Sequence, residues 1–408
     1  NYNTLIDRSA FTREAKIMLN EIKNKYAWMY ETIHLDNKTK GLINYTVWSD
    51  IFICPECTNE IILWEAAVDK NAGKVLDEFA CPHCEAILSK RHMERAWSNR
   101  FDEILNQTIR QAKQVPVLIN YSIGKKRFEK KPDSFDLKLI EKIEQSIVPY
   151  WVPNDRLPEG YNTEQPKGSH GVTHVHHFYT KRNLILLSVF REAIIKSKQY
   201  RTLLYQFDSL VIRQSKLTRF LPTYYFHGGG GWVGTPLSGT LYIPSFSIEV
   251  QPFETWENRV DKTLARVKNS GRDISLIEAR SSSSGSLPTN SCDYIFTDPP
   301  FGGNLMYSEL NFIWEAWLKI FTNNTLEAIE NNVQNKGLPE YQHLMSQCFK
   351  EYYRVLKPGH WMTVEFHNSK NSVWNAIQES LQNAGFVIAD VRTLDKKQGS
   401  FKQVTSAS

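Results

Sequence analysis

The sequence predicts an α/β protein, with an open sheet in its C-terminal part, an inserted zinc ribbon, and a mixed helical and loop insert. Apolar runs with β-branched residues alternate with helical stretches after residue 273, which indicates parallel strands joined by helices. Two Cys-x-x-Cys pairs stand 23 residues apart, and the stretch after them is rich in charge. We therefore expect four parts: 1–43, whose helix continues the core, the ribbon at 44–90, the insert at 91–240 and the sheet-bearing part at 241–408.

Length and composition bound the class of protein. The chain has 408 residues, 41% of them hydrophobic, which is enough for a real core. It lacks a run of about 18 apolar residues and a signal-peptide pattern, so we expect no membrane span and a cytoplasmic location. A net charge of +5 permits nucleic-acid binding. The chain starts without methionine and ends without a closing element, so we expect a piece of a longer protein.

The first half is organised around a metal module. A helix is predicted over Phe11–Trp28 with Thr12 as N-cap, and a strand over Asn44–Ile53 leads into the module. Ile61–Val68 and Val75–Phe79 are expected to form a hairpin between the two cysteine pairs. Paired knuckles of this spacing bring four thiolates to Zn²⁺ at about 2.3 Å. The four expected zinc ligands are Cys54, Cys57, Cys81 and Cys84.

With all four positions filled by protein, that zinc is structural, and His83 inside the second knuckle is a bystander. The ribbon either contacts DNA or supports the fold, and the structural role is favoured. Six cysteines, four of them in these pairs, fit metal binding in a reducing compartment better than disulfides.

The insert is charged and less regular. Ser89–Lys131 is rich in Lys and Arg, which marks either a solvated face or contacts to phosphates. His174 and His176 would share a face of a strand, which allows a second metal site, but no Cys or carboxylate follows at ligand spacing, so DNA contact or loop packing is favoured. We expect a loop over Val148–Pro166. Helices are predicted over Asp136–Ile147, over Lys181–Gln206 after a Thr180 cap, and over Phe253–Asn269.

The C-terminal part alternates between strands and helices. Expected strands are Ile274–Ala279, Asp293–Thr297, Trp361–Phe366 and Phe386–Leu394, and expected helices are Ser308–Phe321, Pro339–Leu356 and Ser372–Ala384. The second strand ends at Asp298-Pro299-Pro300-Phe301, because two prolines cannot donate to a sheet ladder. This turn therefore lies at the carboxyl end of a strand, where open α/β sheets bind ligands.

The turn suits chemistry on an exocyclic amine. The Asp298 carboxylate and the Pro299 carbonyl could accept the two N–H bonds of the amine and free its lone pair. Phe301 offers a face on which a flipped base stacks. Gly302 and Gly303 allow close approach of a ligand to the backbone. The alternative is a strand-ending turn without chemistry.

D-P-P-[FY] after an apolar strand resembles the catalytic motif of the amino-methylating DNA methyltransferases, and aspartate at its first position is usual in the adenine-N6 enzymes. RVLKPGHWMTVEFH, LQNAGFVIADV and FYTKRNLILLS also resemble segments of that family, in a subgroup with an inserted zinc ribbon. The resemblance implies a Rossmann-like methyltransferase sheet, DNA as substrate and S-adenosylmethionine as cofactor. It implies catalytic roles for Asp298, Pro299, Pro300 and Phe301, with residues 241–408 as the catalytic half and 91–240 as a DNA-recognition region.

The family's glycine-rich F-x-G-x-G turn and the acidic residue that holds the ribose are not found at a suitable place in this chain. In this order of parts both would precede Asn1, so we expect only part of the cofactor site and of the sheet here. The resemblance places the cofactor near Glu278, Arg280 and Gly302.

The sequence is compatible with four hypotheses of function. An adenine-N6 DNA methyltransferase of a restriction or phage-defence system, with partner proteins, leads, and cytosine-N4 is the near alternative. RNA guanine-N2 methyltransferases share Asp-Pro-Pro-Phe but are compact, which counts against them. A non-catalytic zinc-ribbon DNA-binding module on a degenerate scaffold is disfavoured by the intact motif.

Overall fold

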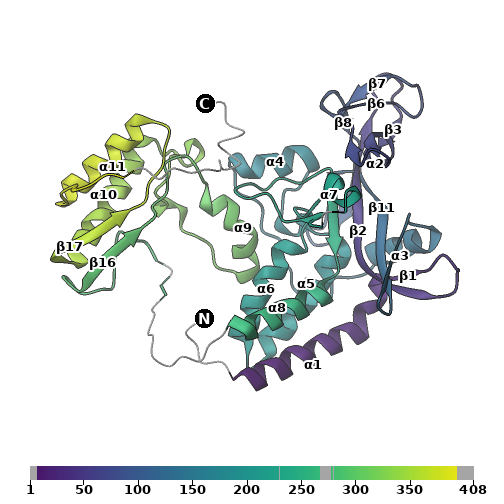
Figure 1. Cartoon of the computed structure of the whole chain (residues 1–408), viewed down its shortest axis with the longest axis horizontal. Helices are drawn as coiled ribbons and strands as arrows, with labels where there is room; N and C mark the ends of the chain where they lie inside the picture. The colour runs from purple at the N-terminus through teal and green to yellow at the C-terminus, as the bar shows by residue number, and fades with distance from the viewer. Residues whose placement is uncertain (1–6, 229, 267–276, 279, 393–408) are drawn as a thin grey trace. The chain divides into compact units, whose positions relative to one another are not determined.

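The computed structural model describes residues 7–228, 230–266, 277–278 and 280–392 (Figure 1). The chain forms two compact units. The large unit comprises residues 1–276 and 307–322, and the small unit comprises residues 277–306 and 323–408. A short segment after the Asp-Pro-Pro-Phe motif therefore belongs to the large unit, although the motif itself lies in the small one.

The large unit is built on a nine-stranded antiparallel sheet within the described residues. Its long central strand, β2 (Lys40–Ile53), confirms the strand predicted at Asn44–Ile53 and pairs with five others. The sheet order is β12-β11-β2-β15-β13-β14, with β1, β3 and β8 also on β2. The other strands are β1 (Glu31–Ile33), β3 (Glu60–Ile62), β8 (Glu94–Arg95), β11 (Gln114–Ile123), β12 (Lys126–Lys130), β13 (Arg219–Phe220), β14 (Val233–Gly234) and β15 (Phe246–Val250).

The sheet shows that the insert is not only helix and loop, because β11 and β12 belong to it. A separate hairpin, β9 (Trp97–Asp102) and β10 (Gln107–Ala112), precedes them. The mixture of charge and apolar residues in this stretch hid the period of two that a strand prediction requires.

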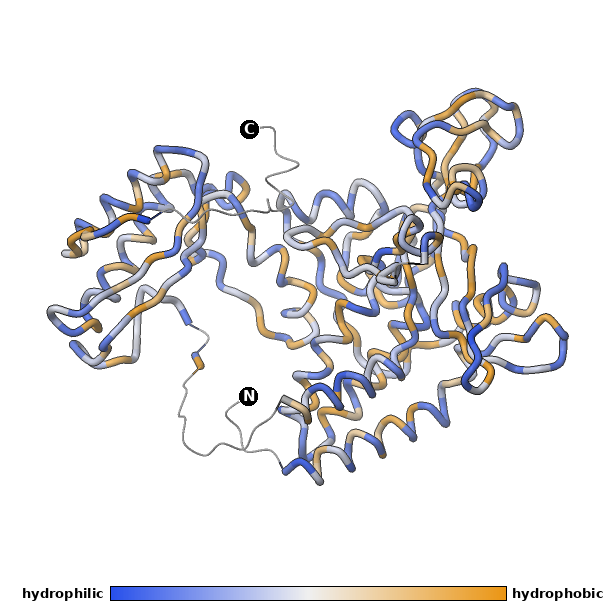
Figure 2. The backbone as a smooth tube through the Cα atoms, in the orientation of Figure 1, coloured by the Kyte–Doolittle hydropathy of each residue, from blue (hydrophilic) through white to orange (hydrophobic). Residues whose placement is uncertain are grey.

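The helices of the large unit pack largely on one another. They are α1 (Arg8–Tyr26), α3 (Ser134–Glu144), α4 (Tyr161–His170), α5 (Lys181–Lys196), α6 (Tyr200–Arg213), α7 (Pro222–Phe226), α8 (Pro252–Arg266) and α9 (Tyr307–Leu318). The buried residues Phe11, Ala15, Met18 and Ile22 of α1 recur every three or four positions, as an amphipathic helix requires, and Figure 2 shows both hydrophobic and hydrophilic residues along this helix. Its N-cap is Asp7, whose carboxylate accepts the Ala10 N–H at 3.0 Å. The prediction of Thr12 as cap was wrong, since Thr12 lies one turn inside the helix and donates to the Arg8 carbonyl.

The core of the large unit is centred on α5, which is buried on nearly all sides. Thr180 caps it as predicted, accepting the N–H of Asn183. The predicted single helix over Lys181–Gln206 is two helices, which break at residues 197–199. Arg182 of α5 forms a buried bidentate ion pair with Glu249 of β15 and stacks over Tyr30 at 4.6 Å. Burying two charges costs desolvation free energy, and the bidentate geometry and the contact with Tyr30 help to offset that cost.

Helix α9 joins this core through Ile313 and Trp317, both fully buried, and the Trp317 indole donates to the Tyr179 hydroxyl at 3.0 Å. Glu309 in its first turn caps α4 by accepting the backbone N–H of Asn162 at 2.8 Å. A Cβ on Gly160 would lie 2.2 Å from the Glu309 carboxylate, so this approach requires glycine. The loop expected over Val148–Pro166 was therefore wrong from Tyr161 on.

The cysteine-rich module contains a helix where a strand was expected. Residues 63–67 form α2 (Leu63–Ala67), with Leu63, Trp64 and Ala67 buried on one helical face. The turn expected near Asn71–Gly73 is confirmed between two short strands. The strands of the module outside the main sheet are β4 (Val68–Asp69), β5 (Lys74–Val75), β6 (Glu78–Ala80) and β7 (Ile87–Ser89).

The small unit holds the predicted parallel pairing. Strand β16 (Cys292–Thr297) runs parallel to β17 (Leu356–Val364), and α10 (Leu338–Val355) packs against α11 (Asn371–Ala384). Gly385, at φ 107°, ends α11 as predicted. The described part of the expected strand Phe386–Leu394 is not a strand, and most of Ile274–Ala279 lies outside the described residues.

Candidate active site and metal centre

The Asp-Pro-Pro-Phe turn follows β16 directly. Thr297, the last residue of the strand, accepts the N–H of Glu365, which follows β17. Because β16 and β17 are parallel, the segments that follow both strands lie at the same edge of the pair. Asp298 is exposed there, whereas Pro299 is buried. The motif thus stands where the sequence predicted it, at the carboxyl end of a parallel strand.

Two side chains hold the backbone of the motif. The Tyr341 hydroxyl of α10 donates to the Pro300 carbonyl at 2.7 Å, and the Asn368 amide donates to the Phe301 carbonyl at 2.9 Å. Asn368 is itself oriented, because its side-chain oxygen accepts the N–H of Lys370 and its carbonyl accepts the indole N–H of Trp374. The anchored carbonyls are those of Pro300 and Phe301. These two hydrogen bonds do not use the Asp298 carboxylate or the Pro299 carbonyl, the two groups expected to accept from a substrate amine.

Aromatic packing positions Phe301. Its ring meets Phe366 edge to face at 5.3 Å, and Phe366 meets Trp374 in the same way at 5.0 Å. Such pairs add to the free energy of burial and fix ring orientation. Sequence reasoning found Phe301 but missed Tyr341, Asn368 and Phe366, which lie far from the motif in the chain.

Gly302 has φ 65°, and a Cβ there would lie 2.7 Å from the Glu330 carboxylate. The positive φ favours glycine at this position, and a larger side chain would also have to displace the end of the Glu330 side chain. Glu278 and Arg280 lie together, joined by an ion pair at 3.2 Å. The Ser286 hydroxyl donates to Glu278 and, with Arg280, lowers the pKa of that exposed carboxyl. The cofactor roles of these three residues stay predictions.

The four predicted zinc ligands converge. Their sulfurs all lie within 4.8 Å of one another, with 3.8 Å between Cys54 and Cys84 and 3.8 Å between Cys57 and Cys81. Tetrahedral zinc with bonds of about 2.3 Å requires sulfurs about 3.8 Å apart. The cysteine geometry therefore fits zinc, which would be held by these four thiolates.

The two knuckles repeat one backbone design. Thr58 donates to the Cys54 carbonyl and Glu85 donates to the Cys81 carbonyl, at 3.0 and 2.9 Å. Thr58 and Glu85 adopt φ of 60° and 63°, a left-handed conformation that costs a non-glycine residue about 1–2 kcal/mol. The His83 backbone N–H donates to Cys81 Sγ at 3.5 Å, while its ring contacts the Glu60 carbonyl at 3.3 Å, so its imidazole is not among the four clustered ligand atoms.

A buried cluster joins His176 and His177 to Asp102, a residue that the sequence gave no reason to select. Both Nε2 atoms contact the same Asp102 oxygen, at 2.8 and 2.7 Å. The Thr173 backbone N–H donates to Nδ1 of His177, so the ring proton is on Nε2 and points at Asp102. The carboxylate and the two imidazole nitrogens lie within 4.8 Å of one another, close enough to hold a metal ion, and binding would release the Nε2 proton. His176 and His177 lie in the 3₁₀ turn Val175–Phe178, not on the strand that the sequence predicted, and their contacts with Asp102 tie this turn to the end of β9.

Comparison with known families addresses the C-terminal part. Residues 292–407 match the N6/N4 methyltransferase family model, described as DNA methylase. The match covers less than a third of the chain and supports the resemblance to the amino-methylating DNA methyltransferases that the motif carries. No curated protein and no solved structure matches the chain. Among the described residues, no helix has both the length and the apolar character that a membrane crossing needs.

Proposed function

We propose that the protein methylates the exocyclic amine of a base in DNA, with S-adenosylmethionine as methyl donor and adenine N6 as the acceptor. The family match supports DNA amino-methylation in general. The observation that carries the site is the Asp298–Phe301 turn, anchored through Tyr341 and Asn368 at the carboxyl end of β16. Aspartate as the first motif residue favours adenine N6, and cytosine N4 is the alternative. A role in restriction or phage defence, in the cytoplasm and with partner proteins, extends this proposal.

In this proposal the chain's own residues orient the amine. The Asp298 carboxylate and the Pro299 carbonyl accept its two N–H bonds, which directs the lone pair out of the ring plane. Phe301 stacks on the extrahelical base. As the nitrogen lone pair forms a bond to the methyl carbon, the bond from that carbon to sulfur breaks, and the amine proton leaves afterward to solvent. Asp298 thus acts as a hydrogen-bond acceptor and not as a strong base. When bound, S-adenosylmethionine would provide an electrophilic methyl group on a sulfonium and would leave as the neutral thioether. Gly302, Glu278 and Arg280 are the residues of this chain proposed to face it.

The zinc ribbon has a structural role in this proposal. Cys54 and Cys81 are almost fully buried, and the hydrophobic cluster around them includes Phe52, Trp64 and Phe79. Zinc would close that cluster and contribute folding free energy.

Labelled methyl transfer to DNA by the full-length protein tests the proposal. Asp298→Asn keeps size and removes the charge, and we expect turnover to fall at least a hundredfold with cofactor binding retained. Asp293→Asn is the matched control, because Asp293 is an exposed carboxylate of β16 paired with Lys357. Full activity of Asp298→Asn would refute the mechanism. Label on cytosine or on RNA would keep the mechanism and change the substrate.

A further inference from the structure

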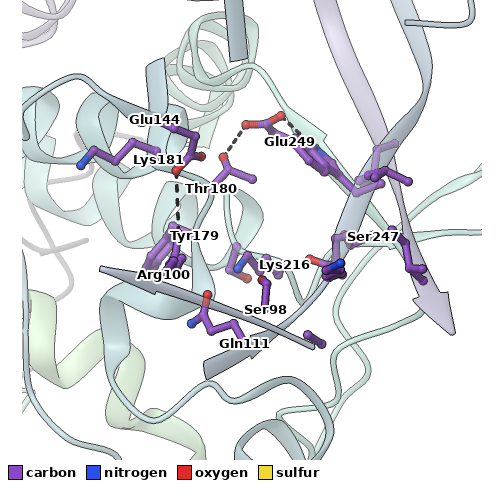
Figure 3. A pocket seen from close by; sticks show the side chains of 18 of the residues that line it. Ser98, Arg100, Gln111, Glu144, Tyr179, Thr180, Lys181, Lys216, Ser247 and Glu249 are labelled. Atoms are coloured by element: carbon purple, nitrogen blue, oxygen red, sulfur yellow. Dashed lines mark hydrogen bonds and ion pairs between the residues drawn. The ribbon is translucent and has the colours of Figure 1, made fainter. Parts of the chain in front are cut away.

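A polar cavity of about 260 Å³ is lined by residues of the large unit. Its walls come from the β9–β10 hairpin, from β2 and β15 of the sheet, from the start of α5 and from the segment after α6. Figure 3 looks into this cavity and draws Lys216 near its middle. Neither the sequence reasoning nor the methylation chemistry assigns it a role.

Three buried polar atoms on its walls have no hydrogen-bond partner among the described residues. Gln214 is 2% exposed, and both its amide nitrogen and its amide oxygen are unpaired. Gln111 is 6% exposed, and its amide nitrogen is unpaired. Buried polar groups are normally satisfied, because leaving them unpaired costs free energy. Two such glutamines on one cavity indicate a polar ligand.

Lys216 gives the cavity its charge. The other cations of the lining are paired with carboxylates: Lys113 with Glu60 at 2.5 Å, Lys181 with Glu103 at 3.1 Å, and Arg100 with Glu144 at 3.8 Å. Within the described part of the chain, Lys216 forms no ion pair closer than 4.0 Å. Burial lowers its pKa to about 8. An anion in the cavity would restore the favourable interactions that this ammonium lost on burial.

The surroundings of Lys216 also favour an anion. The first turn of α5, a 16-residue helix, begins at the cavity wall with Thr180 and Lys181, so its positive dipole end faces this region. Of the two acids in the lining, Glu249 is already held by Arg182, by Thr180 and by Trp48. Glu144 lies beside Arg100. Once these ion pairs are counted, the lining of the cavity carries a net positive charge, that of Lys216.

We propose that this cavity binds a phosphate group, with Lys216 as its charge partner and the amides of Gln111 and Gln214 as donors. Donors that reach one space from β10, from the end of α6 and from the segment after it suit an oxyanion with several acceptor oxygens. The phosphate is either part of a nucleic-acid backbone or a free phosphate such as that of a mononucleotide. Both share the chemistry that the site recognises.

Thermal unfolding in sodium phosphate and in sodium chloride of equal ionic strength tests phosphate binding. A ligand that binds only the folded state raises the melting temperature. We expect phosphate to raise it for the wild type and for Lys40→Gln, a surface lysine outside the cavity, and to have no effect on Lys216→Gln. Gln111→Glu is the second variant: its carboxylate should repel phosphate and pair with Lys216, so it should melt higher than wild type in chloride.

Duplex DNA distinguishes the two sources of phosphate. If Lys216 meets a backbone phosphate, Lys216→Gln should weaken DNA binding and lower the slope of log affinity against log salt by about 1. If the site takes free phosphate, DNA binding should stay unchanged while the phosphate effect is lost. The proposal is overturned if phosphate stabilises Lys216→Gln and Gln111→Glu as much as the wild type, or if neither phosphate nor DNA responds to Lys216. Methylation is not measured, so this outcome is independent of the proposed activity.

Discussion

The hydroxyl of Tyr341 donates a 2.7 Å hydrogen bond to the carbonyl of Pro300, which ties helix α10 to the centre of the Asp-Pro-Pro-Phe motif. Tyr341 is fully buried, so the bond is shielded from water. Tyr341, 41 residues further along the chain, thereby fixes the backbone between Pro299, a proposed amine acceptor, and Phe301, the proposed stacking ring.

Tyr341→Phe should loosen the motif without removing a ring. The buried Pro300 carbonyl would lose its donor, and we expect a loss of about 1–3 kcal/mol in the free energy of unfolding. Methyl transfer should fall while the affinity for DNA changes little. Chemical denaturation and transfer kinetics check this, with the half-exposed Tyr353→Phe as control. Unchanged stability and transfer in Tyr341→Phe would show that the bond does not hold the motif.

Phe301 should act through its flat face. Phe301→Ala removes a stacking surface worth about 1–3 kcal/mol, so the Michaelis constant for DNA should rise more than turnover falls. Phe301→Tyr should be nearly silent, since the face is kept. Phe366→Ala removes the ring packed on Phe301 at 5.3 Å and should give a weaker version of the same effect. Equal losses in Phe301→Tyr and Phe301→Ala would contradict a stacking role.

Zinc should be bound one per chain by the four clustered cysteines. We expect Cys81→Ser to abolish zinc in metal analysis and to lower stability around residues 53–88, since structural zinc contributes to folding. Cys348→Ser is the control, a cysteine of α10 outside the cluster whose pKa burial raises to about 11. Full occupancy in Cys81→Ser, or none in the wild type, would end this assignment.

The basic tip of the β11–β12 hairpin should contact phosphates. Lys125, Lys126 and Arg127 are exposed on or beside β12, the edge strand of the sheet. Replacing all three with glutamine should weaken DNA binding for every sequence and flatten its salt dependence. The same change at Arg13, Lys16 and Lys25 of α1 controls for net charge. If the slope of log affinity against log salt does not change, these residues do not contact phosphates. Their charges would then serve to keep the edge strand β12 from pairing with another chain.

The free energy of unfolding should fall as the pH drops below about 6.5, where His177 of the unfolded chain takes up a proton. Burial lowers the pKa of His177 to about 3, whereas an unfolded histidine titrates near 6.5. Between these values only the unfolded chain takes up the proton, so stability present at neutral pH is lost as pH falls. Urea unfolding at pH 7 and pH 5 should show a difference that shrinks by roughly 1–2 kcal/mol in His177→Gln. His360→Gln, half exposed, should retain the full difference.

Sequence patterns predicted what depends on neighbours in the chain. The motif strand, its parallel partner, α10, α11 and the convergence of four cysteines all follow from local period, turn residues and spacing. Leu63–Ala67 was mistaken for a strand, because a short apolar run fits both periods and packing on β2 decides.

The residues that hold each site in place could not be predicted from local sequence patterns. Tyr341 and Asn368 reach the motif from 41 and 67 residues away, and Asp102 meets His177 from 75 residues away. A tyrosine, an asparagine or an aspartate with an ordinary local pattern carries no mark of the partner that the tertiary fold gives it. The unpaired amides around Lys216 were hidden for the same reason, since an unpaired group is recognised only when its surroundings are known.

Helix α9 has a practical consequence for cutting the protein into parts. The boundaries between the units fall at residues 276, 306 and 322. Helix α9 therefore belongs to the large unit, while the segments on both sides of it belong to the small unit. A gene fragment that starts at residue 277 would express the motif together with a helix whose Trp317 and Ile313 have lost their core. A fragment that stops at residue 276 would lack Glu309, the cap of α4. No single truncation yields either unit intact. After a protease nick at one crossing, the packing of α9 or the pairing of β16 with β17 would still hold the two fragments together.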